Sequence, residues 1–186
     1  RIKKLPFARA ALSSGLVTHD EIQRAEGAIS EIPEPEGETE EDLERRLAEQ
    51  LIQLEILTQY QSDQLSAGRT KFRLGPYIIT DWLGQGGMGQ VFHGYDERLD
   101  RRVAIKVLRQ SRSVPNPPTT PEEAEIAEDL DRDRKRFLRE IRTTARLELA
   151  GAPAVYDTGV EPGPDGVHEL WVVMQLLHGT TLEAVL

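Results

Sequence analysis

One lysine stands inside a strongly apolar stretch of the sequence. Lys106 is flanked by apolar residues within residues 103–108. Side chains alternate between the two faces of a β-strand, so Lys106 shares a face with Ala104 and Leu108. An ammonium group buried without a partner is costly, so either the side chain extends out to water or an anion neutralises it. A phosphate and a carboxylate are the two candidate anions.

A glutamate on the apolar side of a later helix is the best candidate for that carboxylate. At about 100° per residue, Phe137 and Ile141 lie on one side of this helix, and three arginines lie opposite. Glu140 falls on the apolar side, although it would pair and hydrate better among the arginines. We therefore expect Glu140 to contact Lys106, with Glu148, nearer the helix end, as the second candidate.

A run of glycines precedes the lysine and could bind a phosphate chain. Gly84, Gly86 and Gly89 have the spacing G-x-G-x-x-G, which dinucleotide-binding folds also use. In those folds the glycines lead from a strand into a helix, whereas here residues 91–95 alternate like a second strand. The pattern predicts a hairpin whose glycines adopt unusual φ values and let backbone amides approach phosphates. The alternative is a merely flexible turn.

Five short segments rich in β-branched and aromatic residues predict the strands that position these groups. The first three, residues 77–79, 91–95 and 102–108, follow one another closely and predict a meander. Residues 154–160 and 170–177 predict two more strands.

Two further segments lie between the third and fourth predicted strands. Residues 111–131 contain four prolines and six acids against one base, which is typical of a flexible insertion. A helix carrying Glu140 is expected from about residue 132 to residue 149.

The first 70 residues form a more acidic part of the chain, and we expect it to be helical. Apolar residues recur there at spacings of three and four, and the net charge is −6, against −3 for the rest of the chain. Acids without any base fill the segment that starts at Glu31, so a solvated linker is expected at about residues 31–42. Thr18 and Thr58 each precede a Glu or Gln by three positions, which predicts two capped helix starts. This weak repeat could mark a helical docking module, but two ordinary capped helices are favoured.

Composition limits the function further. The 186 residues carry 23 Lys and Arg against 32 Asp and Glu, a net charge of −9, which disfavours nucleic acid and anionic membranes as partners. The absence of Cys excludes disulfides, thiolate metal sites and cysteine nucleophiles. The chain also lacks the apolar run of a membrane helix or signal peptide, so we expect a cytoplasmic protein with no membrane contact in this chain. It starts with Arg1 and stops in an apolar-periodic stretch, and we interpret it as a piece of a longer protein.

Three motifs in a fixed order resemble a known family. Residues 83–91 contain the glycines, residues 103–106 end with the lysine, and residues 136–140 end with the glutamate. In this order they resemble the small lobe of bacterial Hanks-type serine/threonine protein kinases, whose signature includes all three. The resemblance covers about residues 74–186. It implies an α+β fold, with a five-stranded antiparallel sheet and one αC helix, preceded here by the helical segment.

The resemblance also implies a role for each motif residue in binding ATP. Lys106 would hold the α and β phosphates and form with Glu140 the ion pair of the catalytic arrangement. Gly84, Gly86 and Gly89 would cover the phosphates. The remaining implied contacts are with the adenine, by Leu83, Val91, Ala104, the gatekeeper Met174, and the backbones of Gln175 and Leu177.

Parts of the family pattern are missing from this chain. No segment matches the His-Arg-Asp catalytic loop with its later Asn, or the Asp-Phe-Gly that holds Mg²⁺. The Mg²⁺ ligands would therefore lie in a large lobe outside this sequence, and the chain alone should not phosphorylate a protein substrate. The activity expected of the parent is transfer of the ATP γ-phosphate to serine or threonine of a protein. The alternative is a pseudokinase that senses nucleotide or docks a partner.

Overall fold

The structure is a computed structural model of the chain. Its described residues are 2–31, 37–86, 89–108, 117–146, 152–162 and 168–179. The chain divides into two compact units, Arg1–Phe72 and Arg73–Leu186. Each unit is described by itself.

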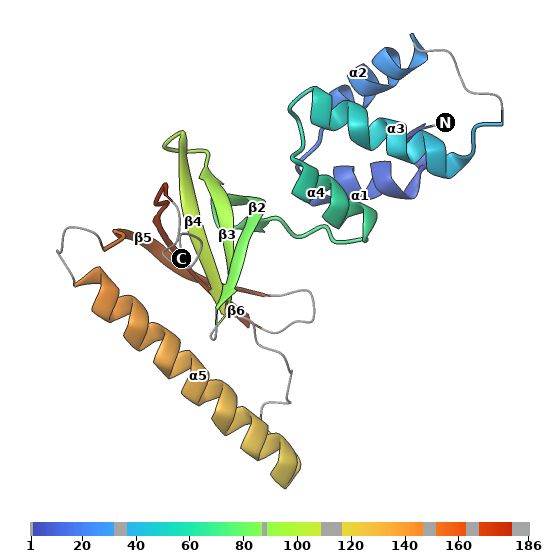
Figure 1. Cartoon of the computed structure of the whole chain (residues 1–186). Helices are drawn as coiled ribbons and strands as arrows, with labels where there is room; N and C mark the ends of the chain where they lie inside the picture. Colours follow the sequence, from blue (N-terminus) through green and yellow to red (C-terminus); the bar gives the residue numbers. More distant parts are fainter. Residues whose placement is uncertain are drawn as a thin grey trace, which may run out of the picture. The chain divides into compact units, whose positions relative to one another are not determined.

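The first unit is built from helices, as its apolar spacing predicts. They are η1 (Ile2–Lys4), α1 (Pro6–Ser14), α2 (His19–Ser30), α3 (Glu40–Gln53) and α4 (Gln59–Ser66) (Figure 1). Their apolar faces form one core, in which Ala8, Ile22, Leu47 and Leu51 have no exposed surface. The unit therefore buries a core of its own.

Three of these helices start with the same side-chain device. The capping boxes predicted at Thr18 and Thr58 are confirmed, because each threonine accepts a hydrogen bond from the amide three residues on and the third residue bonds back. Thr39 and Asp42 form a further box, which the sequence analysis missed. Hydrogen bonds from the Thr39 hydroxyl and amide lower the pKa of Asp42. The expected linker at 31–42 is therefore too long, since α3 already begins at Glu40; residues 32–36 lie outside the described residues.

The second unit contains a six-stranded antiparallel sheet. Its strands are β1 (Arg73–Leu74), β2 (Tyr77–Gly86), β3 (Gly89–Asp96), β4 (Arg101–Leu108), β5 (Val155–Pro162) and β6 (His168–Gln175). They lie in the order β1-β2-β3-β4-β6-β5, with β2, β3 and β4 as the predicted meander. The α+β fold and the five expected strands are confirmed, and the sixth strand, β1, has only two residues.

The sheet curls so that strands from opposite ends of its order come together. The Tyr77 hydroxyl in β2 donates to Asp157 Oδ2 in β5 at 2.9 Å, and the Gly75 amide donates to Glu161 Oε1 at 2.6 Å. The Tyr77 ring also packs edge-on against Trp171 at 5.7 Å between centroids. Curling encloses one face of the sheet, which explains why apolar side chains on that face are fully buried without a covering helix; they include Val103, Ile105 and Val173.

A buried carboxylate stabilises the turn between β3 and β4. Asp96 is fully buried and accepts hydrogen bonds from the backbone and guanidinium of Arg98, while Arg101 Nε lies 3.5 Å from its second oxygen. Burial raises the pKa of Asp96, but the hydrogen bonds and charge of Arg98 outweigh it, so the pKa lies below its ordinary value. Arg98 also donates to the Tyr77 hydroxyl at 3.0 Å, which links this turn to the closure of the sheet.

One long helix, α5 (Pro121–Ala145), accompanies the sheet (Figure 1). The expectation of a flexible insertion through residue 131 and a helix starting near 132 was wrong. Thr120 caps the helix in a box with Glu123, and Pro121 occupies the first turn, where a missing amide hydrogen costs nothing. The acids that suggested a solvated spacer therefore lie at the positive end of a helix dipole. Residues 109–116 and 147–150 lie outside the described residues.

Candidate nucleotide-binding site

Four of the predicted site residues lie on one face of the sheet. Val91 in β3 is paired in register with Lys106 in β4, and Ala104 in β4 is paired with Met174 in β6. Paired residues on antiparallel strands project to the same face, and Ala104 and Lys106 share a face because they are two positions apart. Ala104 is buried, whereas the other three are partly exposed. The sheet therefore offers a small apolar floor with one cation beside it.

The lysine of this face makes the predicted ion pair. Lys106 Nζ lies 2.7 Å from Glu140 Oε1 on α5. The Lys106 side chain is 18% exposed and the Glu140 side chain 42% exposed, so the pair stands at the border between sheet, helix and solvent. Of the open alternatives for Lys106, the structure shows a carboxylate partner, and this partner is Glu140. Glu148 lies outside the described residues.

The second oxygen of this glutamate has no partner in the described structure. Glu140 Oε2 is buried and makes no hydrogen bond there. A buried carboxylate oxygen without a donor is unfavourable, so this atom marks a place where a further donor would be bound favourably.

A single aromatic ring fixes the helix that carries the glutamate. Phe137 is 1% exposed and is the one buried side chain among the described residues of α5. It packs with Leu108, Leu170 and Val172, and its ring centroid lies 5.9 Å from Lys106 Nζ. Because Phe137 precedes Glu140 by almost one helical turn, docking of the ring presents the carboxylate to the lysine. Sequence reasoning placed Phe137 on the apolar side but assigned it no part in the site.

The glycines lie in the predicted hairpin, but the structural need for glycine differs from one position to the next. Gly84 pairs with Val91, and Gly86 pairs with Gly89, so β2 and β3 meet at this end. A Cβ added to Gly84 or Gly86 would meet no atom within 4 Å, whereas one on Gly89 would lie 2.1 Å from the Val107 carbonyl oxygen. None of the three has a positive φ, so the expectation of unusual φ values was wrong. Gly89 is required by the close approach of β3 to β4, and the open positions are Gly84 and Gly86.

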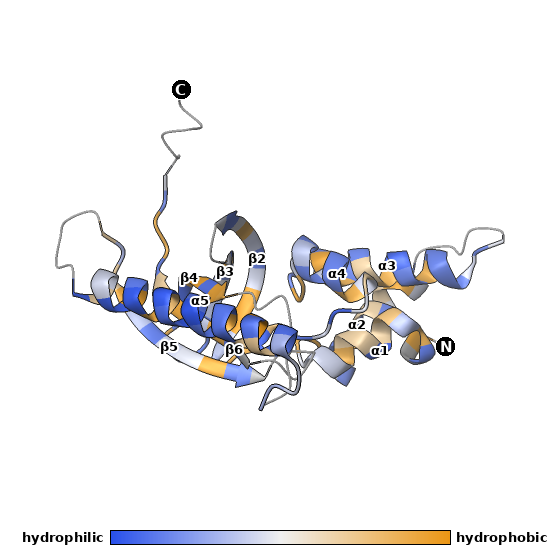
Figure 2. Cartoon of the chain, turned by 90° about the horizontal axis from the view of Figure 1, so that it is seen from below, coloured by the Kyte–Doolittle hydropathy of each residue, from blue (hydrophilic) through white to orange (hydrophobic). Residues whose placement is uncertain are grey.

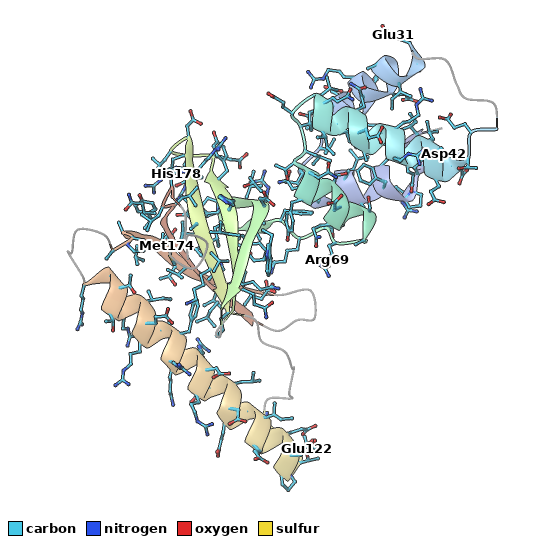
Figure 3. All side chains as sticks on the ribbon, in the orientation of Figure 1. Glu31, Asp42, Arg69, Glu122, Met174 and His178 are labelled. Atoms are coloured by element: carbon cyan, nitrogen blue, oxygen red, sulfur yellow. The ribbon has the colours of Figure 1, made fainter. Side chains whose placement is uncertain are left out.

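The remaining predicted residues are not brought into this cluster by any contact of the described residues. Leu83 is exposed and lies at an irregularity in the pairing of β2 with β3. The Gln175 amide donates to the Ala154 carbonyl at 2.8 Å, so this amide hydrogen is not free for a ligand. Leu177 follows β6 and is also exposed. Figure 3 labels Met174, which precedes these two residues along the chain.

A curled antiparallel sheet, a glycine hairpin and a lysine paired with a helix glutamate are the features expected of a protein kinase small lobe. Comparison with known proteins supports this class. The chain is 37% identical over 115 residues to a probable serine/threonine-protein kinase of Streptomyces coelicolor. The aligned region covers 60% of the chain and 14% of that kinase. It is 36% identical over 115 residues to the kinase PksC of the same organism, and 37% identical over 112 residues to PknA of Mycobacterium tuberculosis.

These relatives confirm the resemblance to bacterial Hanks-type serine/threonine protein kinases. The chain spans only 14% to 22% of the length of these three kinases. No family model matches the chain. A solved structure described as PpkA-294 in its apo form is 24% identical, covers 60% of the chain and 39% of its own, and aligns with a TM-score of 0.45. Among the described residues, no helix is both long and apolar enough to cross a membrane.

Proposed function

We propose that the second unit is the ATP-binding small lobe of a serine/threonine protein kinase. The single observation that carries this proposal is the 2.7 Å contact of Lys106 on β4 with Glu140 on α5. An exposed or half-exposed ion pair contributes little to stability, so the value of holding this lysine in place lies in what it can bind. The proposal also places this lobe in the cytoplasm, where ATP is available.

Lys106 would bind the phosphates of ATP. An ammonium group has three donors, and Glu140 accepts from one of them. The remaining donors can contact phosphate oxygens while the glutamate keeps the side chain from rotating away. Gly84 and Gly86, whose positions are open, would let the backbone of the hairpin approach the same phosphates. Lys106 therefore acts as a positioning cation for the phosphate chain.

The adenine would lie on the apolar floor of the same face. Ala104 has a small side chain and lies in register between His93 of β3 and Met174 of β6. Val91 lies next along the same face, opposite Lys106, and both Val91 and Met174 are partly exposed. A flat base can cover such a floor and bury its partly exposed atoms. Leu83, Gln175 and Leu177 are proposed at the border of this site, with Gln175 contributing no amide hydrogen.

We propose that the parent protein transfers the ATP γ-phosphate to serine or threonine of a protein substrate, and that this chain alone does not. Mg²⁺ would neutralise phosphate charge in that reaction. In the described part of the chain, no group of three or more His or acidic side chains is arranged to hold a metal ion. We propose that the ion is held by the large lobe, outside this sequence.

The two methionines of the chain offer a direct test of ATP binding. Met174 lies on the proposed adenine floor, and Met88 belongs to the glycine sequence. With methyl-labelled methionine, titration with ATP should shift the Met174 signal, with millimolar affinity because only one wall of the cleft is present. Lys106→Ala should weaken this binding, whereas Lys135→Ala should not, since the Lys135 side chain is 75% exposed on α5.

Two results of this titration would contradict the proposal. One is a Met174 signal that does not move with ATP. The other is an affinity that is the same in the wild type and in Lys106→Ala. A pseudokinase parent is distinguished separately, because it would bind ATP in the same way but transfer no phosphate.

A further inference from the structure

The charges of α5 are divided between its two halves. Residues 121–131 carry six acids and no base, whereas residues 132–146 carry seven bases and two acids. Figure 3 labels Glu122 at the end of α5 that lies farther from the sheet, and Figure 2 shows how hydrophilic the helix is along its length. A helix of 25 residues is about 37 Å long, so the two charged halves are well separated along its axis.

Acidic residues of the first half of α5 and arginines of the second half lie along one stripe, on the side of the helix opposite the buried Phe137. At about 100° per residue, Glu128 lies about 180° around the axis from the buried Phe137. Arg132, Lys135 and Asp131 also lie within about 60° of Glu128, but each of them pairs with a neighbour on α5. We use the name outer stripe for the charged residues within this arc that make no such pair. They are Glu125, Glu128, Arg139, Arg142 and Arg146.

The charges of the outer stripe are not neutralised within the described structure. Other charges near the middle of α5 do pair, Asp129 with Arg132 at 2.7 Å and Asp131 with Lys135 at 2.5 Å. The five members of the outer stripe make no ion pair among the described residues. The stripe therefore presents an acidic patch and a basic patch at opposite ends of one helix.

The basic end of the stripe is hollowed and has an apolar side chain in it. This surface is lined by Lys135, Leu138, Arg139, Arg142, Thr143 and Arg146. Leu138 is half-buried there, and Ala124 lies close to the acidic end of the stripe, where a small side chain permits the close approach of another helix. The unpaired charges and the hollowed surface of α5 are therefore both suited to contact with a second helix.

We propose that two copies of the chain pair through their outer stripes, with the two α5 helices antiparallel. A partner that satisfies the whole stripe must bring the opposite sequence of charges, basic where α5 is acidic and acidic where α5 is basic. A second α5 running in the opposite direction has this property, and twofold symmetry then forms the contact twice. Glu125 and Glu128 of one copy face the arginines of the other, whereas a peptide of one charge would satisfy only half of the stripe.

The dimer formed in this way is weak and sensitive to salt. Exposed ion pairs contribute little each, and they are screened as ionic strength rises. The apolar part of the contact is limited to a few side chains such as Leu138 and Ala124. We therefore expect dimers at high protein concentration in low salt, with a dissociation constant that rises about tenfold or more between 50 and 300 mM NaCl.

Sedimentation equilibrium of the 186-residue chain, at several concentrations and in both salts, tests this. The acidic patch is reversed in Glu125→Arg/Glu128→Arg, and the basic patch in Arg139→Glu/Arg142→Glu. The control is Glu41→Arg/Glu49→Arg, which changes the net charge as the first variant does but at exposed positions of α3. Circular dichroism checks that each variant keeps its helices.

The expected result is that each reversal alone abolishes dimers, that an equimolar mixture of the two reversals restores them as heterodimers, and that the control dimerises like the wild type. Three results would overturn the proposal: a wild type that is monomeric throughout, a dimer indifferent to both reversals, or a dimer that the control also loses. A monomer whose α5 amides near Arg142 are nevertheless slow to exchange would show that another segment of the same chain occupies the stripe, which also overturns it.

Discussion

Two glycines of the hairpin should respond in opposite ways to the same substitution. In Gly89→Ala the new Cβ would lie 2.1 Å from the Val107 carbonyl oxygen and 3.2 Å from Leu108 Cα, both of them backbone atoms that cannot rotate away. In Gly86→Ala the new Cβ would meet nothing within 4 Å, and the φ of Gly86 is not positive. The first change should separate β3 from β4, and the second should leave the sheet intact.

The magnitudes follow from the geometry. Overpacking of this kind costs about 1–3 kcal/mol, and the loss of glycine freedom in the unfolded chain returns about 0.4–1 kcal/mol. Gly89→Ala should therefore destabilise the sheet unit by about 1–2 kcal/mol. Gly86→Ala should have no stability cost or a small gain, but it should weaken ATP binding if the hairpin backbone approaches the phosphates there, by about tenfold, or ~1.4 kcal/mol.

The assay can follow the sheet unit alone. Both tryptophans of the chain, Trp82 and Trp171, lie in the sheet, so tryptophan fluorescence during urea unfolding reports this unit. The expected pattern is a lower midpoint for Gly89→Ala with an unchanged midpoint for Gly86→Ala. Equal midpoints for the two variants would refute the assignment of Gly89 to strand packing, and unchanged ATP affinity in Gly86→Ala would refute the role of the open position.

Four further outcomes are expected. Phe137→Ala should remove about 3–5 kcal/mol of packing at most, and since this is the single buried anchor of α5 the helix should undock, seen as fast amide exchange throughout α5 while the sheet stays protected. Asp96 has a lowered pKa, so its stabilisation is present above its unfolded pKa and is lost as pH falls below about 4; Asp96→Asn should be less stable at pH 7 but should lose less on acidification, by fluorescence-detected melting. Thr120→Ala should cost about 1 kcal/mol and shorten α5, seen as a smaller helical signal in circular dichroism. In the parent protein Lys106→Met should lower the rate of phosphate transfer at least about a hundredfold, and a parent whose transfer survives this change does not use Lys106 as proposed.

The ion pair of the site could be predicted because each partner is a charged residue in an apolar part of the sequence. Lys106 stood among apolar residues of a strand and Glu140 on the apolar side of a helix, and each position is unfavourable unless the other is near. A lysine and a glutamate, each at a position where an apolar residue is expected, together predict one contact between them. The structure contains this contact. The strands of the meander were predictable for a simpler reason, since their β-branched residues alternate.

Composition alone gives the wrong prediction for the start of α5, because it leaves out the local chemistry of the helix cap. Four prolines and six acids are typical of spacer, yet the signal for a helix start was present in Thr120, Pro121 and Glu123. The hydrogen bonds of Thr119 and Thr120 lower the pKa of Glu123, which shows how fully its carboxylate is engaged in the cap. Acids at a helix N-terminus are stabilised by the dipole, so their number argued for a helix there and not against one.

The reason for Gly89 could not be read from sequence, because it depends on how closely two strands approach. The same holds for the curl of the sheet, in which Tyr77 reaches Asp157 over a separation of 80 residues. Such contacts follow from twist and register in three dimensions, and single residues carry no sign of them.

The energetics of the ion pair separate its function from its structural effect. Glu140 is 42% exposed, and a pair of this exposure contributes little to folding, whereas Phe137 one turn away is buried and holds the helix in place. If the pair served stability alone, apolar residues at both positions 106 and 140 would serve it at least as well, because they would remove both the buried ammonium and the buried oxygen that lacks a donor. An ion pair kept beside the partly exposed Lys106 fits the phosphate-binding role that we propose for this lysine.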